Sequence, residues 1–311
     1  MSTAPITNNI QNGYLKQPPD YYLTTTNINF INPEGFDELS GPLHPINQVC
    51  MPVDICCYSN SKALTEDFNF KDNGFQFCKL QEEDPLVQTI DKCAQIIREG
   101  SEMINSQLEC ELKDQLQTFL VTWGKENGIP GVPIIATDVV YRSSSPTPDP
   151  YTNRPLCLAH IDFDKERLKD PSTPEGKHYQ SGVRLRLAEC GRTQELSDEE
   201  YSKFVTGKVT YVNIWTSLNI EPSNSTLVVM NKASVQGAKS HPISFGAGMI
   251  SYGPAPHTEQ QWITPDDLTI TKRLLLLFET TDTVHTGIFR TDVPVRPRHS
   301  MEIRTVFGNE L

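Results

Sequence analysis

The residues of this sequence best suited to redox chemistry are two histidines and one aspartate. His160 and Asp162 stand one residue apart at the end of the apolar segment 155–163, and His285 follows far downstream. Two imidazoles and one carboxylate can bind iron(II) on one side and leave other coordination positions open, as non-haem oxygenases require. We therefore predict that His160, Asp162 and His285 are metal ligands.

A short strand over residues 155–161 is expected to position the first two ligands, because this segment is apolar and bounded by turn-forming residues. Residues two apart in a strand point to the same face, so His160 and Asp162 would converge on one point. The alternative is a histidine at the edge of the core that is bonded to a nearby carboxylate. A second pair of this type, His257 and Glu259, lies in a segment rich in Pro and Gly that is typical of a surface loop.

An anion-binding pair is expected at the start of the last predicted strand. Arg298 and Ser300 share one face of this strand with Glu302 and Arg304. A guanidinium fork and a hydroxyl group could together bind one carboxylate, such as that of an oxoacid cosubstrate. The alternative for Arg298 is a strand residue that faces solvent.

The elements that must hold these residues are mainly strands. We expect strands over residues 136–142, 155–161, 208–215, 226–231, 248–252, 273–279, 284–289 and 300–307. Strands of this number and length fit the two facing sheets of a jelly roll, with helices beside them.

The first half of the chain has a different character. Residues 1–25 are polar and are expected to be a loose N-terminal segment, and residues 25–80 hold short extended stretches separated by turns. Over residues 84–127 apolar residues recur at helical spacing, which predicts two helices packed on the sheet.

Taken in order, these segments resemble a fungal and bacterial family of non-haem iron hydroxylases and desaturases. The family is related to gibberellin desaturases and to the methoxylation-associated proteins of cephamycin biosynthesis. Matching segments occur at 139–142, 160–162, 212–218, 261–265, 276–279, 285–286 and 298–304. The resemblance implies a double-stranded β-helix, a cupin-like jelly roll, over residues 135–307. It also implies iron(II), 2-oxoglutarate and molecular oxygen as cofactor and cosubstrates.

One departure from the family pattern concerns the substrate. The family's Trp-Arg-Pro-Leu reads Trp-Thr-Ser-Leu from Trp215 onward, so Thr216 replaces an arginine. If that arginine contacts an anion in relatives, this chain must bind its anion differently, or its substrate has none. Candidates for the substrate pocket are Tyr141, Arg142, Trp215 and Trp262. The alternatives are core packing for Trp215 and a structural ion pair for Arg142.

Composition excludes some classes of partner. The net charge of −12 disfavours nucleic acids and anionic membranes, and no apolar run is long enough to span a membrane. The N-terminus lacks the basic start and apolar stretch of a secretory signal. The 8 cysteines contain no C-x-x-C pair and are expected to be free thiols of a cytoplasmic protein.

We expect a single dioxygenase domain over residues 1–311, an oxidoreductase that depends on iron(II) and 2-oxoglutarate. It would hydroxylate, desaturate or cyclise a small secondary metabolite at an unactivated C–H bond. One alternative is an oxygen-dependent non-haem iron oxidase without 2-oxoglutarate, in which Arg298 binds the substrate's own carboxylate. Another is a non-catalytic jelly-roll binding protein whose histidines are structural. Neither the substrate nor the oligomeric state can be predicted from the sequence.

Overall fold

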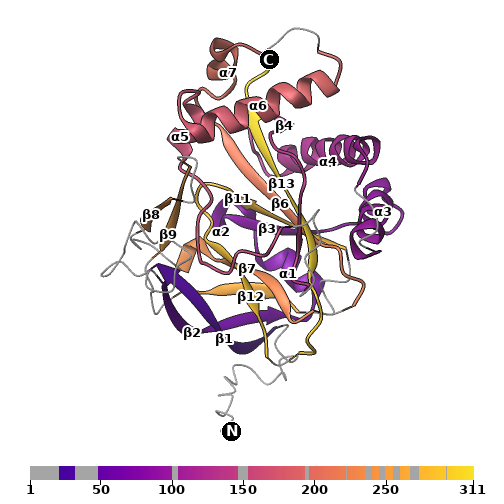
Figure 1. Cartoon of the computed structure of the whole chain (residues 1–311), viewed down its shortest axis with the longest axis vertical. Helices are drawn as coiled ribbons and strands as arrows, with labels where there is room; N and C mark the ends of the chain where they lie inside the picture. Colours follow the sequence, from indigo (N-terminus) through magenta and orange to yellow (C-terminus); the bar gives the residue numbers. More distant parts are fainter. Residues whose placement is uncertain are drawn as a thin grey trace, which may run out of the picture.

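Two β-sheets form the body of the molecule (Figure 1). The computed structural model describes residues 21–31, 48–99, 104–145, 153–192, 196–221, 223–234, 240–244, 249–254, 260–266, 273–291 and 293–311. The first sheet has the order β1 (Tyr21–Ile31), β2 (Gln48–Tyr58), β10 (Trp262–Pro265), β7 (Ser225–Met230) and β12 (His285–Phe289). The second has the order β3 (Phe75–Lys79), β11 (Leu274–Glu279), β6 (Thr210–Ser217), β13 (His299–Gly308) and β4 (Val132–Ile135), and β5 (Val140–Ser143) also pairs with β13.

The path of the chain is that of a jelly roll. After β5 in the second sheet, residues 156–161 run beside β12 of the first sheet, and the chain returns to the second sheet as β6. It then enters the first sheet as β7 and β10 and alternates through β11, β12 and β13. A separate hairpin, β8 (Ser240–Ser244) and β9 (Ile250–Pro254), lies between β7 and β10 in sequence. The predicted double-stranded β-helix is therefore confirmed.

Helices pack against both faces of the second sheet. They are α1 (Ser61–Asp67), α2 (Phe70–Asn73), α3 (Pro85–Glu99), α4 (Ser106–Glu126), α5 (Lys165–Lys169), α6 (Pro174–Glu189) and α7 (Asp198–Phe204), with a 3₁₀ turn at Lys232–Ser234. The Asn105 side chain caps α4, and a Ser197–Glu200 capping box begins α7. Leu112 and Leu116 of α4 are fully buried in one apolar cluster with sheet residues such as Ile303. No helix in the described part of the chain combines the length and the apolar character that crossing a membrane requires.

Three boundaries differ from the predicted ones. Residues 21–25 are the start of β1 and not part of a loose segment, because a Thr-rich run pairs with β2 along its whole length; residues 1–20 lie outside the described residues. Strands β1, β2 and β3 join the sheets, so the sheets extend beyond residues 135–307. The predicted strand 136–142 is interrupted, because Arg304 N donates to the Thr137 hydroxyl (3.1 Å) and not to a backbone carbonyl.

The segment that carries the first two candidate ligands is extended but is not the predicted continuous strand. Leu156 O accepts a hydrogen bond from β12, Ala159 N donates to β1, and Ile161 exchanges two hydrogen bonds with β9. His160 exchanges two with His285 of β12. Because successive residues pair with different strands, no single ladder forms, and only isolated bridges remain.

Candidate metal centre

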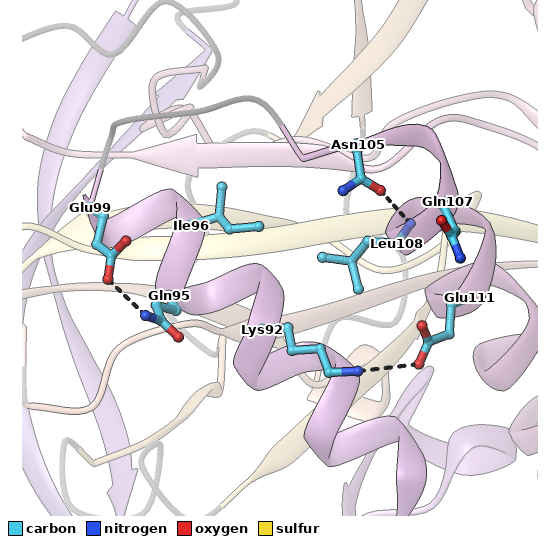
Figure 2. Close-up of a pocket in the computed structure, with 8 residues that line it drawn as sticks. All are labelled: Lys92, Gln95, Ile96, Glu99, Asn105, Gln107, Leu108 and Glu111. Carbon is cyan, nitrogen blue, oxygen red and sulfur yellow. Dashed lines mark hydrogen bonds and ion pairs between the residues drawn. The ribbon is translucent and has the colours of Figure 1, made fainter.

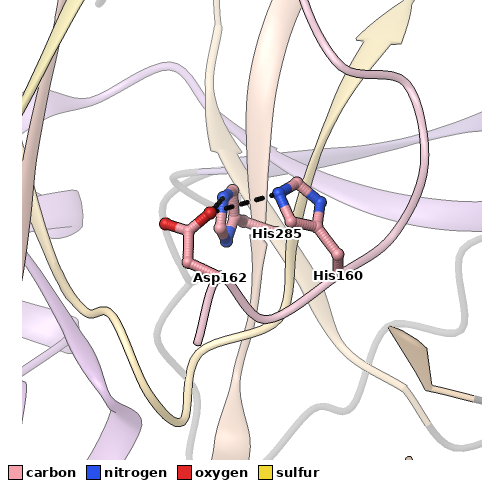
Figure 3. Close-up of side chains that lie close together, drawn as sticks. All are labelled: His160, Asp162 and His285. Atoms are coloured by element: carbon pink, nitrogen blue, oxygen red, sulfur yellow. Dashed lines mark ion pairs between the residues drawn. The ribbon is translucent and has the colours of Figure 1, made fainter. Parts of the chain in front are cut away.

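Three side chains from the two predicted segments meet between the sheets (Figure 3). Asp162 Oδ1 lies 3.4 Å from His160 Nε2 and 3.9 Å from His285 Nε2, and each residue offers a ligand atom within 4.8 Å of the others. All three side chains are buried. The structure therefore brings together the residues that the sequence predicted as metal ligands.

Each histidine is held in the tautomer that a metal ligand needs. His160 Nδ1 lies 2.7 Å from Leu158 O, and His285 Nδ1 lies 3.2 Å from Thr283 O. A carbonyl oxygen can only accept, so Nδ1 carries the proton and the Nε2 lone pair is left for a metal. Burial and the neighbouring His160 lower the pKa of His285 to about 4, so its ring is neutral at physiological pH.

Asp162 is ionised although it is buried. Burial alone would raise the pKa of Asp162, but the Arg304 cation holds it well below its ordinary value. Its Oδ2 accepts hydrogen bonds from Asn213 Nδ2 at 2.5 Å and from Arg304 Nη2 at 3.2 Å. The carboxylate therefore offers its other oxygen to the histidines.

The spacing of the triad fits an octahedral metal ion. With bonds of about 2.1 Å, neighbouring ligand atoms of an octahedron are about 3.0 Å apart and opposite ones about 4.2 Å apart. The separations of 3.4 Å and 3.9 Å lie between these limits, so small side-chain rotations would bring both nitrogens into neighbouring positions. Two neutral imidazoles and one carboxylate suit iron(II) with open positions.

The predicted anion-binding pair is buried and has donors without partners. Arg298 Nε and Nη1 and Ser300 Oγ form no hydrogen bond with the part of the chain that the structure describes, and both residues are buried. Burial, together with the nearby Arg142 cation, lowers the pKa of Arg298 to about 10, so its guanidinium remains charged at neutral pH. A buried cation without a partner is costly, whereas a bound carboxylate would satisfy both side chains.

The four pocket candidates do not all reach this region. Trp215 does: it pairs with Glu302, and the Arg298 guanidinium lies 5.9 Å from the centre of its ring. Arg142 pairs in register with Ser300, and its Nε lies 3.3 Å from Glu302 Oε2, so it is also an ion-pair residue.

Tyr141 and Trp262 lie elsewhere. Tyr141 is next to Arg142 on β5, so it points to the opposite face of the sheet and packs in the apolar cluster under α3 and α4. Trp262 pairs with Met230 and shares a cluster with it on the face of the first sheet opposite His285. The structure does not bring either residue to the triad, and we leave both out of the candidate site.

Thr216 also points away from the triad. Its neighbour Trp215 faces the triad, so alternation places Thr216 on the opposite face of the sheet, where its hydroxyl donates to Leu274 O at 2.8 Å. The side chain of an arginine at this position would start from the same face, away from the triad.

Residues that the sequence did not single out complete the site. Asn213 and Thr280 form a hydrogen-bonded chain to Asp162, and Glu302 lies between Arg142 and Arg304. Asparagine is uncommon in strands, so Asn213 within an apolar strand was a signal that could have identified it. Glu302 and Arg304 were recognised as sharing a face with Arg298 and as part of the matching segment 298–304, without a role of their own.

A surface pocket lies away from the triad, between α3 and α4 (Figure 2). It has a volume of about 440 Å³, and its polar side chains pair with one another, as in the Lys92–Glu111 ion pair at 3.7 Å and the Gln95–Glu99 hydrogen bond at 2.9 Å. None of the candidate site residues lines it, so it has no part in the chemistry considered below.

Comparison with known proteins gives a structural likeness only. No protein-family model matches the sequence, and no curated protein sequence matches it. The structure is similar to that of the "iron and alpha-ketoglutarate-dependent endoperoxidase NvfI", with a TM-score of 0.63 and 13% sequence identity over 93% of this chain and 99% of that one. A second structure of NvfI, in a different conformation, has a TM-score of 0.61 at 13% identity over 93% of this chain and 98% of that one. The non-heme alpha ketoglutarate dependent epimerase SnoN has a TM-score of 0.40 and 10% identity over 80% of this chain and 85% of that one, too low to bear on the fold. The chain therefore has the jelly-roll fold that NvfI has.

Proposed function

We propose that this chain is an iron(II)- and 2-oxoglutarate-dependent dioxygenase that oxidises an unactivated C–H bond of a small secondary metabolite. The reaction would be a hydroxylation, a desaturation or an oxidative cyclisation. The observation that carries the proposal is a His-Asp-His triad in the same interior as Arg298 and Ser300. Both of these side chains are buried, and Arg298 Nε and Nη1 and Ser300 Oγ have no hydrogen-bond partner among the described residues. The likeness to NvfI, which is iron and alpha-ketoglutarate dependent, supports the same class.

Different residues of the chain would bind the metal and the oxoacid. His160, Asp162 and His285 would hold the iron, and bound iron supplies the activation of dioxygen. Arg298 would pair with the carboxylate of the oxoacid that is remote from the metal, and the Ser300 hydroxyl would donate to the same group. The Arg142 cation near Arg298 adds to the positive potential that attracts a dianion.

The interior beside the triad is apolar, which suits a reaction that must exclude water. The Phe278 ring lies 4.6 Å from the His285 ring, and Trp215, Leu276 and Val229 belong to the same buried cluster between the sheets. Water excluded from this space cannot compete with substrate or quench a reactive centre. Trp215 would therefore form an apolar wall next to the anion site.

The test is an anaerobic titration of the full chain with iron(II) and then with 2-oxoglutarate, followed by absorption. We expect a visible metal-to-ligand charge-transfer band. His160→Ala should lose the band and the metal, whereas Arg298→Ala should keep the metal and need more 2-oxoglutarate. His241→Ala and Arg296→Ala are matched controls, because His241 lies on β8 and Arg296 pairs with Glu221 on the surface.

The other outcomes identify the alternatives. Iron binding without a band at any 2-oxoglutarate concentration would indicate the oxygen-dependent oxidase, in which Arg298 binds the substrate's carboxylate. Wild-type protein that binds no iron would contradict the metal centre and leave a jelly-roll binding protein.

A further inference from the structure

We infer that Asn213, oriented by Thr280, is a positioning residue that makes Asp162 a metal ligand through one oxygen only. This role depends on the proposed metal centre and specifies how its carboxylate is presented. Asn213 lies on β6 and Thr280 directly follows β11, and both are fully buried. Neither would contact the metal or the substrate.

The two oxygens of Asp162 have different surroundings. Oδ2 accepts from Asn213 Nδ2 at 2.5 Å and from Arg304 at 3.2 Å (Nη2) and 3.4 Å (Nε). Oδ1 is the oxygen that faces His160 and His285. Donors on Oδ2 occupy its lone pairs and prevent the carboxylate from turning, so Oδ1 alone is left for a metal ion.

Asp162 and Thr280 together orient the Asn213 amide. An ionised carboxylate can only accept, so the amino end of the amide faces Asp162 and donates to it. The carbonyl end then faces Thr280, whose hydroxyl donates to Asn213 Oδ1 at 2.7 Å. Without the hydroxyl this buried oxygen would lose its donor, and the amide would be held less firmly against Asp162. Thr280 is itself anchored to the strand of Asn213, because its backbone N–H donates to Tyr211 O at 3.0 Å.

Arg304 alone would not fix the carboxylate. Its Nη2 lies 2.6 Å from Glu302 Oε1, which is closer than its 3.2 Å contact with Asp162. The guanidinium is therefore shared, and its stronger contact is with Glu302. The shorter hydrogen bond to Asp162 comes from Asn213.

The expected effect is on metal affinity. Groups that hydrogen-bond a metal ligand from behind typically change metal affinity by about 10- to 100-fold when removed. We expect Asn213→Ala to weaken metal binding by at least about tenfold. Thr280→Val keeps the shape of the side chain but removes the hydroxyl, and should weaken binding by about fivefold or more, whereas Thr280→Ser should bind as wild type does.

The experiment is a titration of the metal-free full chain with Co(II), which binds such sites and absorbs in the visible range. Dissociation constants and band shapes are compared for the wild type and the three variants. Thr226→Val is the matched control: it also removes a buried hydroxyl, 3.3 Å from Thr264 Oγ1, and its partner across the ladder is Ile288, on the face opposite His285. Thermal unfolding of each variant without metal shows that it is folded.

The results separate this role from the metal centre itself. If wild type binds Co(II) and Asn213→Ala or Thr280→Val binds it equally well, Asn213 is only a structural residue and the inference fails. It also fails if Thr280→Ser is weakened as much as Thr280→Val, because the hydroxyl would then not matter. If Asn213→Ala does not fold, the comparison of Thr280→Val with Thr280→Ser tests the inference. Wild type that binds no Co(II) would overturn the proposed function, and this role with it.

Discussion

His160 and His285 are joined through their backbones as well as through the carboxylate between them. His160 N donates to His285 O at 3.1 Å, and His285 N donates to His160 O at 2.9 Å. Two candidate ligands from distant parts of the sequence are therefore fixed to each other without a metal. A site held in this way loses little conformational entropy when a metal binds.

Metal binding should stabilise the folded chain, because the two histidines and Asp162 converge only when the chain is folded. At a free metal concentration of about 100 times Kd the gain is about 2.7 kcal/mol. For a domain of this size that corresponds to a rise in Tm of roughly 5 °C. Thermal unfolding with anaerobic iron(II), and again after adding a chelator, measures it. His285→Ala should show no rise and His241→Ala a full one; an equal rise in both would place the metal elsewhere.

Arg298→Met should raise the stability of the metal-free protein and abolish its stabilisation by 2-oxoglutarate. The substitution removes a buried cation whose Nε and Nη1 have no hydrogen-bond partner in the described segments, while keeping much of the side-chain volume. We expect the Tm of the metal-free protein to rise by roughly 2 °C, or about 1 kcal/mol. In the presence of metal, 2-oxoglutarate should further stabilise wild type but not the variant. A lower Tm in the variant would mean that Arg298 has a stabilising partner in the resting protein.

Glu279→Gln should stabilise the protein at neutral pH. Burial raises the pKa of Glu279 above its ordinary value of 4.5, although the Lys232 ammonium at 3.6 Å opposes this. Because the folded chain then holds this proton more tightly than the unfolded chain, stability falls as pH rises from the ordinary pKa through the raised one. Glutamine removes that loss, so the gain in Tm should be present at pH 7 and should shrink toward about pH 4. The exposed Glu66→Gln should show little effect at either pH.

Gly182→Ala should destabilise the protein although alanine favours a helix. A Cβ at this position of α6 would lie 1.8 Å from Ala136 O, a backbone atom of the residue that follows β4 and whose N–H donates to Arg304 O. The gain in helix propensity is about 1 kcal/mol, and overpacking typically costs about 1–3 kcal/mol or more. We expect a net loss of roughly 2 kcal/mol in urea unfolding. Ser181→Ala, one residue earlier and exposed, is the control and should leave stability within about 0.5 kcal/mol.

The strands of the jelly roll were predictable because their side chains alternate or run apolar over lengths typical of strands. The predicted strands at 208–215, 226–231, 273–279, 284–289 and 300–307 appear as β6, β7, β11, β12 and β13 with ends shifted by one or two residues. β10 was missed, because Trp262–Pro265 is short and ends in a proline. The segment 155–161 has the composition of a strand, and only the folded structure shows that its hydrogen bonds go to several strands.

The sequence predicted those site residues whose type alone indicates a role. The ligands and the Arg298–Ser300 pair have residue types that point to a role, whereas the role of Asn213 depends on Thr280, which is distant in sequence. The sequence also did not show which face of the sheet each pocket candidate occupies. Tyr141 and Trp262 are aromatic residues of the two sheets, but each lies on the face opposite the triad, which depends on register.

The hydrogen bonds of residues 156–161 to β1 and β12 bear on how the chain could be divided. Ala159 N donates to Asn29 O at 2.8 Å, and Asn29 Nδ2 donates to Cys157 O at 3.0 Å. The N-terminal hairpin β1–β2 thus supports the backbone that presents His160, although it lies far upstream of every candidate ligand. A fragment that begins at residue 135 would contain all the candidate site residues. It would still lack the hairpin whose hydrogen bonds hold the backbone of residues 157–159. The part of the chain that contains the candidate ligands is therefore not an autonomous unit, and recombination between relatives would have to transfer the hairpin with it.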